Sequence, residues 1–378
     1  MTAVAAPPTV AEQPEARDNQ LEGLRAIAAL AVTMTHAGFL SGQIGRDVLP
    51  GPVARLDIGV AIFFVLSGFL LYRPHARHHA GLADRPGLRR YAVRRVFRLF
   101  PALLPVIAAT YFLVPESRTV GAAPWLANLV QVQAVRSDWL LPGLAQLWSL
   151  STEVMFYLAL PLIAAFIGKL ARGSASRELA VLALLTLTAW GSRVVLHTEP
   201  GQVMTWDRTL VSHLDWFAGG MAIAVVRARP ELHARVRAVS APAVGSILAV
   251  AASLFWVLST SLAGPFDLSE RPLRADLFKH IGYAVFAVLV VAPAALLSDP
   301  VLQRVLAGRR MVALGATSYG IFLWHLPIMF FVRETAGWPL FGGKFWLTWI
   351  ITLALTIPVA QLSWRFLEAP ILAWARRF

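Results

Sequence analysis

Apolar stretches of about 20 residues recur along almost the whole sequence and constrain its fold more than any other feature. Hydrophobic residues make up 57% of the chain and charged residues only 15%, whereas a soluble domain carries about 25% charged residues. A helix of about 20 residues crosses a hydrocarbon core of about 30 Å. We therefore predict an all-α, polytopic membrane protein.

Ten membrane spans can be drawn, and they occupy most of the chain. Their predicted ranges are 21–40, 56–73, 99–115, 147–167, 178–197, 209–227, 241–262, 273–297, 311–333 and 343–365. We predict a disordered cytoplasmic N-terminus over residues 1–20, which are polar and contain prolines but no signal-peptide pattern. A transmembrane domain over 21–368 and a short basic cytoplasmic tail over 369–378 complete the predicted organisation.

The basic residues predict the orientation of these spans. If the N-terminus is cytoplasmic, the inner segments include 74–98, which alone holds seven arginines, and the short segments 168–177, 228–240 and 298–310. Arginine and lysine are enriched in cytoplasmic loops. The bias favours both termini in the cytoplasm and a location in the inner (cytoplasmic) membrane. It also accounts for the net charge of +13 without a nucleic-acid partner.

The first span contains two ionisable residues, Arg25 and His36, which are eleven residues apart. This spacing is almost three helical turns, so both side chains leave one helix face about 16 Å apart. Ionisable groups in a membrane helix are costly and usually face a protein interior or a wet cavity. We predict a site here, with a cation near the cytoplasmic surface and a titratable base deeper in the membrane.

Glu153 in the fourth span is predicted to lie at about the depth of His36. Ser149 and Tyr157 occur four residues before and after it and share its helix face. A carboxylate near a histidine can orient the ring and stabilise its protonated form. We therefore predict that Glu153 supports His36 as a general base, with Ser149 and Tyr157 contacting substrate. Alternatively, Glu153 pairs two helices without a catalytic role.

Three further polar residues are candidate substrate contacts. His325 falls in the outer half of the ninth predicted span, and His213 and Asp215 begin the sixth. The alternatives are a hydrogen-bonded packing role for His325 and a hydrated helix mouth for His213 and Asp215.

Three arginines, Arg94, Arg95 and Arg98, precede the third span, and Arg95 and Arg98 share a helix face. Guanidinium groups suit phosphates because they offer forked, permanently charged donors. Basic residues also anchor many cytoplasmic helix ends, so both interpretations stay open. The sequence shows no metal-binding spacing and no cysteine, and it predicts no metal site. Ser67-Gly68 in the second span is predicted to allow close helix packing.

Five segments together resemble the acyltransferase-3 family of membrane O-acyltransferases. They are Leu-Glu-Gly-Leu-Arg-Ala-Ile-Ala-Ala-Leu, Phe-Phe-Val-Leu-Ser-Gly-Phe-Leu, Arg-Arg-Val-Phe-Arg-Leu-Phe-Pro, Leu-Trp-Ser-Leu-Ser-Thr-Glu and Ser-Tyr-Gly-Ile-Phe-Leu-Trp-His, in the family's order. The resemblance implies a ten-helix fold that takes an acyl group, expected to be acetyl, from cytosolic acyl-coenzyme A. The implied acceptor is a hydroxyl of a sugar, an envelope glycan or a secondary metabolite such as a macrolide.

The resemblance also assigns roles to individual residues. The family's arginine and histidine pair falls on Arg25 and His36, its Arg-x-x-Arg pattern on Arg95 and Arg98, and its membrane glutamate on Glu153. Two departures stand out. Ala61 occupies a position where members often have an aspartate, and Asp57, one helical turn earlier, is a possible substitute. The sequence also ends soon after the tenth span, so a standalone membrane domain without the C-terminal hydrolase-like domain of some members is expected.

These observations predict direct acyl transfer. Arg94, Arg95 and Arg98 would hold the phosphates of acyl-coenzyme A, Arg25 would guide the donor, and His36 would act as general base. The main alternative is a proton-coupled transporter or flippase with His36, Glu153 and His325 as a proton relay. A non-catalytic membrane scaffold is a third possibility.

Overall fold

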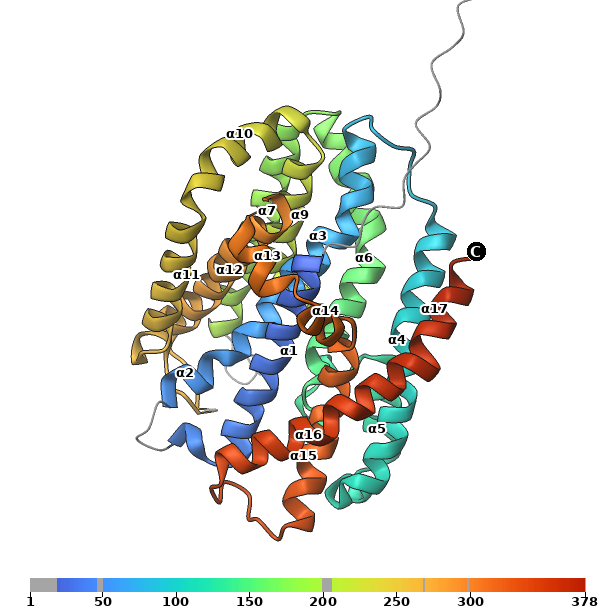
Figure 1. Cartoon of the computed structure of the whole chain (residues 1–378), viewed down its shortest axis with the longest axis vertical. Coiled ribbons are helices and arrows are strands. Elements are labelled where there is room, and N and C mark those ends of the chain that lie inside the picture. Colours follow the sequence, from blue (N-terminus) through green and yellow to red (C-terminus); the bar gives the residue numbers. More distant parts are fainter. Residues whose placement is uncertain (1–18, 46–49, 199–205, 268, 298, 378) are drawn as a thin grey trace, which may run out of the picture.

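The computed structural model describes residues 19–45, 50–198, 206–267, 269–297 and 299–377, and these residues form helices and their connections (Figure 1). The all-α fold class is confirmed, and no strand occurs in the described residues. The long helices are α1 (Asn19–Leu40), α3 (Gly59–His79), α4 (Leu88–Leu113), α6 (Leu147–Ala171), α7 (Ala175–Thr198), α9 (Leu214–Arg227), α11 (Val244–Leu258), α12 (Leu273–Leu296), α15 (Ser318–Thr335) and α16 (Phe345–Ser363). The shorter ones are α2 (Pro50–Arg55), α5 (Ala122–Val130), α10 (Pro230–Ser240), α13 (Pro300–Leu306), α14 (Arg309–Ala316) and α17 (Ala369–Ala375).

The helices fit a multi-pass membrane protein, although not all ten predicted spans reach full length. Within the described residues, 8 helical segments are long and apolar enough to cross a membrane. A ninth arises if α14 and α15, which are bent by 65° at their junction, form one span. The sixth predicted span, 209–227, contains α9, which has 14 residues and is therefore about 21 Å long. The number ten and the orientation of the termini stay predictions.

The predicted domain boundaries shift slightly. Residues 1–18 of the predicted disordered N-terminus lie outside the described residues, whereas Asn19 and Gln20 already belong to α1. At the other end, residues 364–368 form a π-helical turn that joins α16 to α17, so helix continues into the predicted tail. Residue 378 is not described.

Helix α1 lies in the middle of the bundle and is flanked by α3 and α12 to α16 (Figure 1). Two glycines allow its backbone to approach its neighbours. A Cβ atom added at Gly23 of α1 would lie 2.2 Å from the Leu306 carbonyl oxygen, and one added at Gly315 of α14 would lie 2.0 Å from the Glu22 carbonyl oxygen. Small residues permit such contacts between membrane helices. Because it is enclosed, α1 can present Arg25 and His36 to the protein interior.

Helices α3 and α9 pack closely through glycines on both sides. A Cβ atom at Gly68 of α3 would lie 2.2 Å from the Phe217 carbonyl oxygen, and one at Gly220 of α9 would lie 1.9 Å from the Val65 carbonyl oxygen. The close approach predicted from Ser67-Gly68 is therefore observed. It holds the short helix α9 against the interior face of α3.

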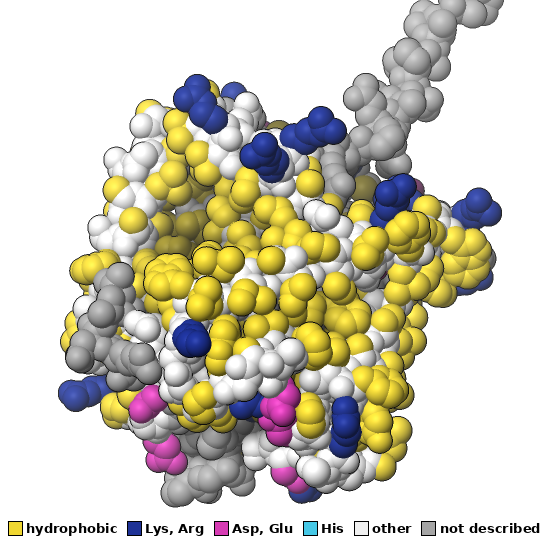
Figure 2. All heavy atoms as spheres, turned by 60° about the horizontal axis from the view of Figure 1, so that its bottom comes forward, with side chains coloured by type: hydrophobic (Ala, Val, Ile, Leu, Met, Phe, Trp, Pro, Cys, Tyr) yellow, Lys and Arg dark blue, Asp and Glu magenta, His cyan; other side chains and the backbone are white. Residues whose placement is uncertain are grey.

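The two ends of the bundle differ in charge. We call the end that carries α10 and the connection between α3 and α4 the basic end; it is at the top of Figure 1. Figure 2 shows a broad area of hydrophobic side chains with Lys and Arg above it, whereas below it the acidic side chains lie among further Lys and Arg. An apolar belt between two charged ends agrees with membrane embedding.

The glycine contacts between α3 and α9 predict a stability effect. Gly68→Ala should lower the thermal unfolding temperature in detergent by several degrees, because overpacking a close contact costs about 1–3 kcal/mol. Gly245→Ala in α11 is the matched control, since nothing lies within 4 Å of the added Cβ. Equal unfolding temperatures for the two variants would contradict the packing described here.

Candidate active site

A small cavity of about 50 Å³ lies inside the bundle between α1, α3, α6 and α15. Its polar lining comes from Arg25, Ser67, Ser149, Glu153, Ser318 and Tyr319. These residues come from four helices that are far apart in sequence. The cavity thus brings two predicted site residues, Arg25 and Glu153, to the same enclosed space.

Glu153 is held by two hydroxyl groups. Its Oε1 atom accepts hydrogen bonds from Tyr157 Oη, at 2.8 Å, and from Ser67 Oγ. Arg25 faces the same cavity, and its buried Nε has no hydrogen-bond partner in the described chain. A buried donor without a partner costs free energy, so Arg25 is poised to bind a group that the protein does not supply.

The three arginines of α4 separate into two groups. The Arg95 guanidinium lies 5.6 Å from the centre of the Tyr157 ring, and its buried Nε also has no partner among the described residues. The Arg98 guanidinium lies 5.3 Å from the ring centre of Tyr319, and its Nη1 is 3.6 Å from Glu368 Oε2. Arg94 is exposed. Arg98 therefore lies against Tyr319 of the cavity wall, Arg95 lies against Tyr157, whose hydroxyl binds Glu153, and Arg94 lies at the surface.

His36 is paired with His325 rather than with Glu153. His36 Nδ1 lies 2.9 Å from His325 Nε2, and the ring centroids are 5.0 Å apart. His325 Nδ1 lies 3.2 Å from the carbonyl oxygen of Ile321. A carbonyl only accepts, so His325 Nδ1 carries the hydrogen and its Nε2 accepts from His36 Nδ1. The basic nitrogen of His36 is then Nε2, which has no hydrogen-bond partner among the described residues.

Asp57, the carboxylate one helical turn before Ala61, is held by two partners of its own. Asp57 Oδ2 lies 2.7 Å from Lys279 Nζ, and its other oxygen accepts from the Tyr283 hydroxyl. Both oxygens of Asp57 are thus bound by Lys279 and Tyr283, and no contact among the described residues assigns Asp57 the role of the aspartate missing at Ala61. Depth along a helix was a poor guide to the partner of His36, because it does not say which helices are neighbours.

His213 and Asp215 lie in a different buried cluster. Asp215 accepts hydrogen bonds from His280 Nε2, at 2.9 Å, and from Trp190 Nε1, at 3.1 Å. The His213 ring packs on Trp216, with centroids 4.7 Å apart. Neither His213 nor Asp215 lines the cavity, so the structure does not bring these two predicted substrate contacts to Arg25 or His36.

Sequence reasoning missed several residues of the site. Ser67 had been assigned a packing role only, although its hydroxyl bonds Glu153. Tyr319 and Phe322 both line the cavity, and the ring centroids of Phe322 and His325 are 5.9 Å apart. Both occur one turn apart in the segment that ends at His325, which was the available signal. No group of His, Asp or Glu side chains in the described residues could hold a metal ion.

The helical bundle is apolar outside and holds polar groups inside. These are the cavity with Arg25 and Glu153 and the hydrogen-bonded pair His36 and His325. The class defined by these features is a membrane protein with an internal polar site. A family model described as an acyltransferase domain matches residues 18–365. The chain therefore belongs to the acyltransferase-3 family.

Curated relatives match the same region. The O-acetyltransferase OatA of Staphylococcus aureus (strain NCTC 8325 / PS 47) is 26% identical over 368 residues, covering 93% of this chain and 56% of that protein. The peptidoglycan O-acetyltransferase OatA of Listeria monocytogenes is 28% identical, with 93% and 55% covered. The putative peptidoglycan O-acetyltransferase YrhL of Bacillus subtilis is 27% identical, with 93% and 54% covered.

The chain spans about half the length of the curated relatives it matches. No solved structure is significantly similar to it.

Proposed function

We propose that this protein is a membrane O-acetyltransferase that moves an acetyl group from acetyl-coenzyme A to a hydroxyl of a cell-envelope glycan. The observation that carries the proposal is the His36–His325 hydrogen bond, which leaves His36 Nε2 available as a base. Membership of an acyltransferase family supports the reaction class. The relatives are named as O-acetyltransferases, and two of them as acting on peptidoglycan, which supports a glycan acceptor.

The donor is proposed to enter from the basic end, which we place in the cytoplasm. Arg25 lines the cavity, Arg98 and Arg95 lie against Tyr319 and Tyr157, and Arg94 adds positive charge at the surface. The two buried Nε groups of Arg25 and Arg95 would gain acceptors from the phosphates or the polar arm of coenzyme A. The acyl end would then extend along α1 toward His36.

The proposed transfer is a single substitution at the thioester carbonyl. The acceptor hydroxyl oxygen attacks the carbonyl carbon as His36 Nε2 removes the hydroxyl proton. A carbon–oxygen bond forms, the carbon–sulfur bond breaks, and the proton passes from His36 to the leaving sulfur. The products are an O-acetyl ester and free coenzyme A. His325 fixes the His36 tautomer, so that Nε2 is the basic nitrogen.

Glu153 has a different proposed role from the one expected at first. It holds the Tyr157 and Ser67 hydroxyls and offers a negative charge opposite Arg25, which keeps the cavity polar for the arm of the donor. Ser149, in the same wall, is a further candidate substrate contact. The geometry lends no support to an acceptor contact at His213 or Asp215.

The alternative proposals are a proton-coupled transporter and an acceptor other than a glycan, such as a macrolide. A relay through His36, His325 and Glu153 would need these three groups to exchange protons directly or through water. The structure connects the two histidines but bonds Glu153 to Ser67 and Tyr157. This arrangement favours the enzyme over the transporter.

The proposed function predicts a donor-dependent reaction in a purified system. Protein in nanodiscs, given acetyl-coenzyme A labelled in the acetyl group and a glycan fragment, should produce a labelled, alkali-labile ester and free coenzyme A in equal amounts. Mass spectrometry and thiol titration measure the two products. Movement of the glycan across vesicles without consumption of acetyl-coenzyme A would favour the transporter and contradict the enzyme.

The proposed positioning role of His325 predicts a difference between two substitutions. His325→Phe removes the acceptor for His36 Nδ1 and should lower kcat about 100-fold, with little change in the KM for acetyl-coenzyme A. His325→Gln retains an amide oxygen that can accept the same hydrogen and should recover part of the loss. His233→Gln in α10, at the basic end, serves as the control. Equal losses for His325→Phe and His325→Gln would contradict a role through the tautomer of His36.

A further inference from the structure

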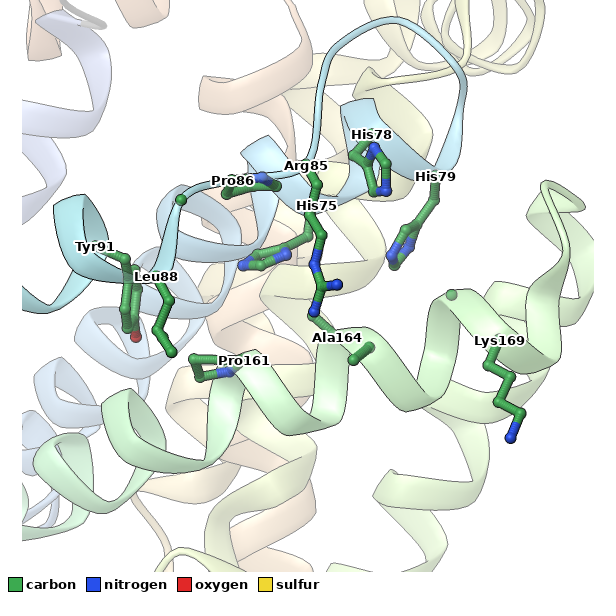
Figure 3. A pocket seen from close by; sticks show the side chains of 13 residues that line it. His75, His78, His79, Arg85, Pro86, Leu88, Tyr91, Pro161, Ala164 and Lys169 are labelled. Atoms are coloured by element: carbon green, nitrogen blue, oxygen red, sulfur yellow. The ribbon is translucent and has the colours of Figure 1, made fainter.

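A second, larger pocket opens at the basic end, away from the internal cavity. Its volume is about 620 Å³, and it lies between the end of α3, the connection to α4, the start of α4 and the second half of α6 (Figure 3). Small-molecule pockets typically have volumes of about 300–1,000 Å³. The pocket is therefore large enough for a nucleoside with a phosphate group.

The charged lining of this pocket is entirely basic. Arg85 reaches from the connection into the middle of the pocket, and His75, His78 and His79 of α3 lie beside it (Figure 3). Lys169 of α6 stands at the far rim, and no Asp or Glu is part of the lining. Gly87 and Leu88 at the start of α4 also line the pocket, so the free N–H groups of a 26-residue helix add to its preference for an anion.

A buried ion pair fixes the wall behind these histidines. Glu178 is fully buried and binds His79 Nδ1 at 2.9 Å, Tyr72 Oη at 2.7 Å and Arg229 Nη2 at 3.1 Å. Its charge is thus balanced by Arg229 and does not repel an anion in the pocket. The other edge of the His79 ring faces Gly168, which lines the pocket.

The opposite half of the pocket is apolar and leads toward the cavity. Leu88, Tyr91 and Pro161 form this part of the wall (Figure 3). Tyr91 donates a hydrogen bond of 2.9 Å to the carbonyl of Tyr157, the residue whose hydroxyl binds Glu153. Ala164 in the pocket and Glu153 in the cavity are separated by eleven residues of α6, which corresponds to about 16 Å.

We propose that this pocket binds the 3′-phosphorylated nucleoside end of the coenzyme A donor, with Arg85 on the ribose 3′-phosphate and Tyr91 beside the base. The inference rests on the proposed function. Coenzyme A carries a ribose phosphate and a separate diphosphate, followed by an extended arm that ends in the thioester. Arg95 and Arg98 lie nearer the cavity and so suit the diphosphate, whereas the pocket lies farther out and suits the ribose phosphate.

The decisive experiment compares acetyl-coenzyme A with acetyl-3′-dephospho-coenzyme A as donors. Arg85→Ala should raise the KM for acetyl-coenzyme A about tenfold, the size expected for one charge-assisted contact to phosphate. It should change the KM for the dephospho donor by less than about twofold, because the contact is already missing there. Arg237→Ala in α10 removes the same charge from the same end, outside the pocket, and should leave both values unchanged. Arg85 and Arg237 are both exposed, so the two variants should fold.

A binding assay separates this inference from the proposed function. The protein is placed in nanodiscs of phosphatidylcholine alone, and its binding of adenosine 3′,5′-bisphosphate is measured by calorimetry. The wild-type protein should bind the bisphosphate, and Arg85→Ala should raise the Kd about tenfold. Such binding without any acetyl transfer would retain the pocket and overturn the function. Normal transfer with equal KM changes for the two donors would overturn the pocket assignment and retain the function.

The same assay tests for a lipid in the pocket. If anionic phospholipid in the nanodisc abolishes binding of the bisphosphate, and Arg85→Ala does not distinguish the two donors, the pocket holds a lipid headgroup and the inference is overturned. Competition by lipid should instead be weak, and the preference for the 3′-phosphorylated donor should persist.

Discussion

Placing ionisable groups inside an apolar bundle costs free energy, and this cost determines where the polar side chains of this structure can lie. Such groups are tolerated only where they are paired, hydrogen-bonded or exposed to a wet cavity. Glu153 meets this requirement through Ser67 and Tyr157, and Asp215 through His280 and Trp190. The groups without a partner in the described chain therefore stand out, and the clearest of these is the buried Nε of Arg25.

The position of α1 places two of its ionisable residues inside the protein. Its glycine contacts enclose the helix, so Arg25 and His36 face the protein rather than lipid. Arg25 borders a cavity that also contains Glu153, and His36 lies about 16 Å farther along the helix beside His325. In the proposed reaction, the long arm of the donor would reach from the basic end to His36, and the acceptor hydroxyl would approach from the other end.

The helical fold and the polar face of α1 could be predicted from the sequence, because span length and helical spacing are local properties. The partner of His36 could not, because it depends on which helices are neighbours, and depth alone made Glu153 as good a candidate as His325. The length of α9 was overestimated, because the apolar run from residue 209 includes a 3₁₀ turn before the helix begins. The pocket at Arg85 combines three segments that have no shared sequence pattern.

The central claim is that His36 removes the acceptor proton. It is tested most directly by single-turnover transfer from labelled acetyl-coenzyme A with equal amounts of folded wild-type and His36→Ala protein. The account predicts a transfer rate reduced by about 10²- to 10⁴-fold in the variant, with unchanged donor binding, because a general base contributes about this factor. A His36→Ala variant that transfers acetyl groups at the wild-type rate would contradict it.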